Sequence, residues 1–152
     1  MALVTAALAN GGTLYRPRLV RGLRAPGNLG FREFPSKITN RLGWSDASLE
    51  IVRKAMLNTV MSARGTGRYA AVPGVAIAGK TGTAEFGPKA LGKKRGWMIA
   101  YAPFDSPRYA VAMVLDNAPA GGGTDVGPRL RRGFGRLFGV QVAGSPRKAD
   151  QG

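Results

Sequence analysis

The stretch that most constrains the fold of this chain is PGVAIAGKTGTAEFGP, which begins at Pro73. Residues 74–81 match G-x-x-x-x-G-K-T, the phosphate-binding P-loop, and this pattern needs a strand before it and a helix directly after it. Residues 80–83 read K-T-G-T, which is a second motif, and a K-T-G motif is expected to lie on a β-strand. The two motifs therefore predict different local structures for the same residues.

The residues that follow Lys80 favour the strand. They read TGTAEFGP, whose glycines and proline cannot sustain the first turns of a helix. Pro73 also stands directly before the first glycine, where a P-loop needs a strand. A nucleotide-binding P-loop protein remains an alternative, because the apolar segment at residues 110–116 ends in Asp116, as a Walker B segment would.

Hydrophobic periodicity predicts one partial domain over residues 1–138 and a flexible tail over residues 139–152. The first helix ends at Asn10-Gly11 but has no capping residue before it, so we expect the chain to begin within a domain. A short ribbon of strand follows, and residues 25–44 are expected to form a loop. The remaining expected elements are a helix at 46–62, strands at 75–84, 96–104 and 108–117, and a helix at 124–138.

The charge of the chain predicts an anionic neighbour. Lys and Arg number 23 against 8 acidic residues, which gives a formal net charge of +15. The chain has no Cys and no His, which excludes thiolate chemistry, Cys/His metal sites and a Ser-His-Asp arrangement. We therefore expect no metal site and no cofactor, and no apolar run is long enough to span a membrane.

A basic module that binds RNA or an anionic surface is a second alternative. The sequence RGFGRLFG, from Arg132 to Gly139, begins like an RNA-recognition signature. The match then fails, because the signature needs an aromatic residue where Arg136 stands. An amphipathic helix explains the segment better, with Leu130, Phe134, Leu137 and Phe138 directed inward and the arginines outward.

Four segments occur in the order found in one enzyme family: ALVTAALANGGTLYRPRLV, VRKAMLNTVM, GTGRYAAVPGVAIAGKTGTAE and WMIAYAPFDSPRYAVAMVL. Over about residues 1–118 the chain resembles the C-terminal part of the transpeptidase domain of a class B penicillin-binding protein, of the elongation type that includes penicillin-binding protein 2. The resemblance implies an α/β (α+β) fold with a five-stranded antiparallel sheet and flanking helices. It also implies that the K-T-G strand borders the active site and that a C-terminal helix covers the sheet.

The resemblance further implies a peptidoglycan D,D-transpeptidase that acylates on D-Ala-D-Ala stem peptides and is trapped by β-lactams. Lys80 would be an electrostatic anchor, Thr81 and Thr83 would hold the substrate carboxylate, and Gly82 would leave space for the acyl chain. The backbone amide of Thr83 would serve the oxyanion hole. The parent protein would work on the outer face of the inner membrane with cell-wall elongation partners, and no nucleic acid is expected.

The nucleophile that this chemistry requires is missing from the chain. The family uses S-x-x-K for the serine and its activating lysine, and S-x-N for proton transfer and substrate binding. None of the six serines is followed by Asn at the second position, and only Ser145 has Lys at the third, Lys148, with Pro146 between them in the tail. We therefore expect the chain to be a fragment that is inactive by itself.

A second basic cluster lies in KALGKKRG, at residues 89–96. Such a run is ordinarily a solvated turn. In the resembled family it would flank the cleft, so Lys93, Lys94 and Arg95 are candidate contacts for acidic peptidoglycan strands or anionic lipid.

Overall fold

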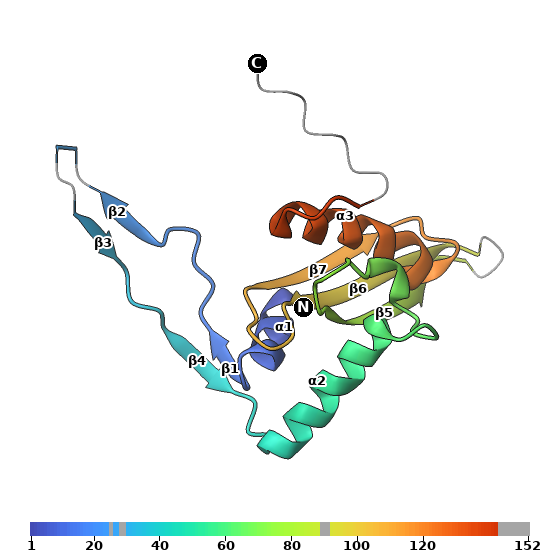
Figure 1. Cartoon of the computed structure of the whole chain (residues 1–152), viewed down its shortest axis with the longest axis horizontal. Helices are drawn as coiled ribbons and strands as arrows, with labels where there is room; N and C mark the ends of the chain where they lie inside the picture. Colours follow the sequence, from blue (N-terminus) through green and yellow to red (C-terminus); the bar gives the residue numbers. More distant parts are fainter. Residues whose placement is uncertain (25, 28–29, 89–91, 143–152) are drawn as a thin grey trace.

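A three-stranded antiparallel sheet lies at the centre of the molecule (Figure 1). The computed structural model describes residues 1–24, 26–27, 30–88 and 92–142. The strands are β5 (Ala78–Glu85), β6 (Lys94–Ala102) and β7 (Tyr109–Leu115), in the order β5-β6-β7. The expected fold class, an antiparallel sheet with flanking helices, is confirmed, but the central sheet has three strands among the described residues where the resemblance implies five.

Helices cover both faces of this sheet. On one face lie α1 (Ala2–Ala9) and α2 (Asp46–Met61), and on the other lie η1 (Arg68–Ala70), η3 (Gly122–Val126) and α3 (Gly127–Phe138). Alternate residues of a strand point to opposite faces, so Met98 and Ala100 join the α3 side while Ile99 and Tyr101 join the α1 and α2 side. The sheet is thus the middle of three layers.

Helix α2 begins where its sequence provides a cap. The side chain of Ser45 accepts a hydrogen bond from the backbone N–H of Ser48 at 3.2 Å, which satisfies one of the free donors of the first turn. Leu49, Met56 and Val60 are buried at 3- and 4-residue spacing. This helix carries the chain from the base of the molecule to the edge of the sheet at β5 (Figure 1).

The strand bounds differ from those expected by one to three residues, and the differences have local causes. Val75 does not belong to β5, because its N–H bonds back to the carbonyl of Val72 around the turn at Gly74, where φ is +73°. β6 starts at Lys94, since Lys94 pairs with Glu85, and it ends at Ala102 because Pro103 has no N–H for the ladder. The helix expected from 124 begins as the five-residue π-helical turn η3.

Helix α3 ends in a left-handed glycine. Gly139 has φ +69°, and the N–H of Val140 donates to the carbonyl of Gly135 at 2.8 Å, which closes the helix in a Schellman arrangement. Leu130 and Phe134 are buried as expected. The expectation for Leu137 is wrong, because its side chain is exposed on the outer side of the helix, where no layer covers it.

Residues 25–44 do not form a loop throughout, which corrects the expectation from sequence. They contain β3 (Phe31–Glu33) and β4 (Ile38–Arg41), which pair antiparallel with β2 (Gly22–Arg24) and β1 (Thr13–Tyr15) respectively. The described residues between 13 and 41, called the arm below, therefore form a long ribbon that extends away from the sheet (Figure 1). Pro17 and Pro35 lie between the two ladders, where the strand pairing is interrupted.

Candidate functional site

The K-T-G-T residues lie on β5, at the edge of the sheet. β5 pairs with β6 along one side only, with Lys80 opposite Ile99 and Thr83 opposite Gly96. Its other side has no strand partner among the residues that the structure describes. An edge of this kind leaves backbone N–H and C=O groups able to receive an extended peptide as an additional strand.

The helix that a P-loop requires is not present after Gly79-Lys80-Thr81. These residues and the four that follow them continue as strand to Glu85. Helix dipole and loop amides therefore cannot combine around a phosphate at this position. The P-loop interpretation is wrong for this chain.

The side chains of the motif separate onto the two faces of β5. Thr81 and Thr83 point to the same face, and they line one polar hollow of about 360 Å³. Lys80 and Gly82, together with Thr81, line a second, almost wholly apolar hollow of about 350 Å³, which Met1, Trp97 and Ile99 complete. Because β5 is an edge strand, both hollows open beside the same unpaired backbone.

Hydrogen bonds hold the two threonine side chains of the polar hollow in place. The Oγ1 atoms of Thr66 and Thr81 are 3.0 Å apart, and the N–H of Gly122 donates to Oγ1 of Thr83 at 3.3 Å. The walls therefore come from three segments that are far apart in sequence: η1 with the turn before it, β5, and η3 with the residues just before it. The hollow is lined by Thr66, Arg68, Tyr69, Thr81, Thr83, Ala120, Gly122, Gly123 and Thr124.

Arg68 brings a positive charge to this hollow. Its guanidinium donates to the hydroxyl of Tyr69 at 2.9 Å and stacks over the ring of Tyr69 at 4.5 Å from the centroid. Hydroxyls, an exposed guanidinium and backbone N–H groups together suit a carboxylate, which accepts hydrogen bonds and carries the opposite charge. Sequence reasoning missed Arg68, although the adjacent GTG at 65–67 marked a turn close to a functional strand.

Close packing at consecutive glycines shapes the other wall of the polar hollow. A Cβ at Gly122 would lie 2.2 Å from the carbonyl oxygen of Trp97, and one at Gly123 would lie 2.0 Å from that of Thr66. Only glycine lets the backbone of η3 cross the sheet this closely. The sequence signal was the run APAGGGTD, which composition alone indicates to be a flexible loop.

Lys80 lies on the other face, and its Nζ donates to the carbonyl oxygen of Thr81 at 2.7 Å. The apolar surface beside it is incompletely covered, since Trp97 and Val114 remain 37% and 42% exposed on neighbouring strands. Met1, directly before α1, and Val4 within α1 are exposed as well. This part of the sheet face is thus an apolar surface next to an ammonium group.

The structure separates the basic residues of the β5–β6 connection from the two hollows. Arg95 forms an ion pair with Asp116, with Nε 2.8 Å from Oδ1, and its guanidinium lies over the ring of Phe86. Lys94 pairs with Glu85 in the ladder, two residues beyond Thr83. Lys93, Lys94 and Arg95 line neither hollow, so a role beside the cleft stays a prediction.

No serine among residues 1–24, 26–27, 30–88 and 92–142 lines either hollow. Ser145 and Lys148, the only S-x-x-K spacing, lie outside the described residues. Within the described part, no group of three His, Cys, Asp or Glu side chains is placed to hold a metal ion. Among the described helices, none combines the length and the apolar character that a membrane span requires.

Comparison with known proteins agrees with this arrangement. Residues 1–133 match the family model described as the penicillin binding protein transpeptidase domain. The chain is 34% identical over 121 residues to the peptidoglycan D,D-transpeptidase PbpA of Mycobacterium tuberculosis, a match that covers 76% of this chain and 23% of that protein. The chain therefore spans less than a quarter of the length of this relative.

Solved structures show the same fold. Penicillin-binding protein 2B from Streptococcus pneumoniae superposes with a TM-score of 0.73 at 32% identity, covering 90% of this chain and 23% of that one. Penicillin-binding protein A from M. tuberculosis, in an imipenem acyl-enzyme complex, superposes with a TM-score of 0.67 at 31% identity, covering 85% of this chain and 28% of that one. Neither comparison favours an RNA-binding module, and the RGFGRLFG segment lies in helix α3 and Gly139.

Proposed function

Because this chain belongs to the penicillin binding protein transpeptidase domain family, we propose that it supplies the substrate-binding wall of a peptidoglycan D,D-transpeptidase site. The observation that carries this proposal is the K-T-G-T sequence on an unpaired edge strand, with both threonine hydroxyls in one polar hollow. A stem peptide ending in D-Ala-D-Ala would lie along β5 as an additional strand. Peptide backbone would then supply affinity, and the hollow would recognise the terminal carboxylate.

Each residue of the motif has a proposed role. Thr81 and Thr83 donate hydrogen bonds to the substrate carboxylate, and the charge of Arg68 strengthens them. Lys80 places an ammonium on the face where the reacting serine would stand. Gly82 keeps the strand free of a Cβ, and the amide of Thr83 stabilises the developing oxyanion.

The chain by itself would bind without acylation. Its serines lack the S-x-x-K and S-x-N surroundings that activate a nucleophile, so the reacting serine would come from residues outside these 152. The exposed apolar surface around Trp97 and Val114 suits the contact with that part of the domain. We expect β-lactams to engage the same wall, because a related penicillin-binding protein A forms an acyl-enzyme complex with imipenem.

The wider setting of the parent protein follows from the family resemblance. We propose that the domain works on the outer face of the inner membrane with cell-wall elongation partners. Lys93 and Lys94 would then be available to acidic wall polymers or lipid headgroups. Reversal of the charges of Lys93, Lys94 and Arg95 should reduce cell-wall binding of the full protein, and unchanged binding would reject that role.

An NMR titration of the chain with N-acetyl-D-Ala-D-Ala tests the substrate-binding wall. Amide shifts should change saturably at residues 80–83 and 122–124, with a dissociation constant in the roughly millimolar range of a small ligand that makes few contacts. Thr83→Val keeps the β-branched shape and removes the hydroxyl, so it should abolish the shifts. Thr39→Val removes a hydroxyl from the arm and serves as the matched control.

Two results would contradict the proposal. One is equal response to N-acetyl-L-Ala-L-Ala, which would show that the strand does not select the substrate configuration. The other is an unchanged titration in Thr83→Val, which would show that the polar hollow takes no part. Tight, salt-sensitive binding of RNA in place of the peptide would favour the basic-module alternative.

A further inference from the structure

The arm buries little apolar surface, so it contributes little to the stability of the fold. It consists of two short antiparallel ladders, β1–β4 and β2–β3, and projects away from the sheet (Figure 1). Apolar side chains on it remain in solvent, with Leu19 fully exposed and Leu23 60% exposed. A two-stranded ribbon of this kind is marginally stable in water. Its exposed apolar side chains therefore indicate a binding surface for a ligand or partner.

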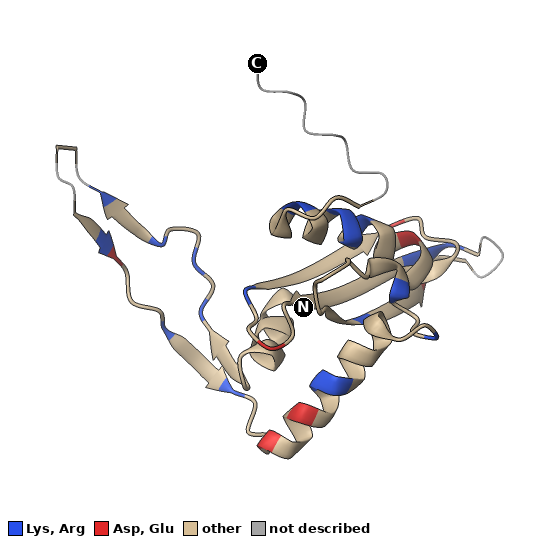
Figure 2. Cartoon of the chain, viewed as in Figure 1, with Lys and Arg blue, Asp and Glu red and all other residues tan. Residues whose placement is uncertain are grey.

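The arm is also strongly basic. Seven cationic side chains occur between residues 13 and 41, against one carboxylate, Glu33 (Figure 2). They are Arg16, Arg18, Arg21, Arg24, Arg32, Lys37 and Arg41. Charges of one sign on a thin ribbon repel each other, so an anionic ligand would stabilise the arm.

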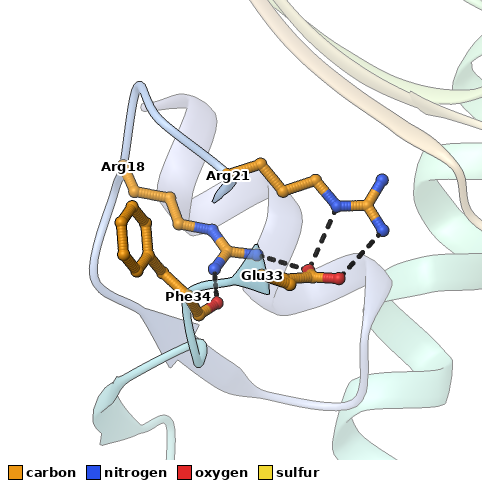
Figure 3. Close-up of polar contacts among 4 residues, drawn as sticks. All are labelled: Arg18, Arg21, Glu33 and Phe34. Atoms are coloured by element: carbon orange, nitrogen blue, oxygen red, sulfur yellow. Dashed lines mark hydrogen bonds and ion pairs between the residues drawn. The ribbon is translucent and has the colours of Figure 1, made fainter. Parts of the chain in front are cut away.

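Glu33 is already held by two arginines, as Figure 3 shows. Arg21 contacts both carboxylate oxygens, at 3.1 and 3.2 Å, and Nη2 of Arg18 lies 3.2 Å from Oε1. The hydrogen bond from Arg21 lowers the pKa of Glu33. Nη1 of Arg18 also donates to the carbonyl oxygen of Phe34, so this clamp fixes Arg18 against the opposite strand.

A hollow of about 180 Å³ lies between the two ladders, beside this clamp. We call it the arm hollow, lined by residues 16–18, Val20, Phe34, Pro35 and Lys37. The N–H of Arg16 donates to the carbonyl of Lys37 at 2.7 Å, which places these two cations opposite each other. Like charges opposite each other destabilise a ribbon, and neither side chain forms an ion pair with a described residue.

We propose that the arm hollow binds carboxylate groups of an uncross-linked peptidoglycan strand, at a second site separate from the β5 cleft. Arg16, Arg18 and Lys37 would contact the carboxylate, and Phe34 with Pro35 and Val20 would receive the short apolar part of the same unit. This inference rests on the proposed function, which makes such a polymer the substrate.

The distribution of side chains on the ribbon favours a polymer strand over a lipid surface. Directly opposite residues share a face, so Leu23 stands beside Arg32 on one face and Phe31 beside Arg24 on the other. Neither face is continuously apolar, as insertion into a bilayer interface would require. A flexible strand can instead follow both rows of arginines.

A second contact with the same polymer would raise the local concentration of stem peptides at β5. When two sites bind one molecule, occupation of the second becomes intramolecular, and the overall affinity exceeds that of either site. The arm and β5 lie on different sides of the molecule in Figure 1, so one strand would have to run over the surface between them. Short muropeptides cannot reach both sites, so the arm should not raise their affinity for β5.

Co-sedimentation of the 152-residue chain with purified uncross-linked peptidoglycan tests the arm hollow. The variant Arg16→Glu/Lys37→Glu should bind about tenfold more weakly at low salt, since two favourable contacts become repulsive. Arg16→Lys keeps the charge and should stay within about twofold of the parent. Arg132→Glu/Arg136→Glu makes the same charge change on exposed positions of α3 and should also stay within about twofold.

The outcomes separate the arm hollow from its alternatives. Peptidoglycan with its carboxylates converted to amides should lose the arm-dependent part of binding. Equal losses in the arm and α3 variants would overturn the proposal, because only net charge would then matter. Tighter arm-dependent binding to phosphatidylglycerol vesicles or to single-stranded RNA would overturn it too. Failure of the β5 cleft would show itself separately, in the N-acetyl-D-Ala-D-Ala titration.

Discussion

At the scale of single residues, the glycines of η3 determine how closely the backbone of η3 approaches the sheet beside the polar hollow. Gly122→Ala should lower the free energy of unfolding by about 1 to 3 kcal/mol, because its Cβ would lie 2.2 Å from a backbone oxygen of Trp97. It should also weaken binding of N-acetyl-D-Ala-D-Ala, since Gly122 donates to Thr83. Urea unfolding and the NMR titration measure the two effects.

Gly133→Ala is the matched control, since Gly133 lies inside α3 and a Cβ there meets nothing within 4 Å. Alanine is favoured over glycine in a helix, so this variant should gain about 0.5 to 1 kcal/mol. Equal changes in the free energy of unfolding for Gly122→Ala and Gly133→Ala would contradict the close approach of η3 to the sheet.

The clamp around Glu33 gives a pH prediction at the same scale. The hydrogen bond from Arg21 lowers the pKa of this carboxyl in the folded state. The carboxylate therefore stabilises the arm at pH values above the ordinary pKa of a glutamate. That contribution disappears as the pH falls through the lowered pKa. A carboxyl carbon-13 NMR titration should place the Glu33 midpoint below the ordinary range of a glutamate side chain.

Arg21→Gln should raise the midpoint of Glu33, because it removes the largest cause of the shift in pKa. An unchanged midpoint would show that the ion pair of Figure 3 is not populated in solution.

At the scale of elements, helix α2 offers a direct test of which side chains hold the sheet in place. Val60 is 1% exposed in the core, whereas Ile51 on the same helix is 70% exposed. Val60→Ala should cost about 2 kcal/mol of unfolding free energy, because it removes buried methyl groups and leaves a cavity. Ile51→Ala should change stability by less than about 0.5 kcal/mol, and similar losses at both positions would contradict the placement of this helix.

The predictability of these elements followed the strength of their local signals. Helix α2 has a capping serine and a regular apolar spacing, so its position could be predicted from sequence within a residue. β3 and β4 carry almost no apolar alternation and have every residue exposed, so periodicity could not reveal them. Leu137 is exposed although the periodicity placed it on the inner face of its helix. A helical pattern identifies the apolar face but not how much of that face is covered by other elements.

The candidate site was predictable only in part for a related reason. K-T-G-T is contiguous, and the glycines and proline after it are enough to indicate a strand from the sequence alone. Arg68 and the start of η3 reach the same hollow from distant parts of the chain. Their contribution depends on how η1 and η3 pack against the sheet, and no local pattern contains that information.

At the scale of the whole molecule, the proposed function divides binding and chemistry between this chain and residues outside it. The chain provides an edge strand, a polar hollow and an ammonium group, and it belongs to a transpeptidase family whose compared members are several times longer. Its described serines line neither hollow. A chain built in this way should recognise a β-lactam without forming a covalent bond to it.

A titration of the 152-residue chain with penicillin G, followed by NMR and then by intact mass in the same sample, tests this division most directly. We expect saturable amide shifts at Lys80, Thr81, Gly82 and Thr83, lost in Thr83→Val, together with a protein mass that does not change. A penicilloyl adduct on any serine would contradict the claim that the nucleophile lies outside this chain. Absence of shifts at these four residues would contradict the claim that β5 is the binding wall.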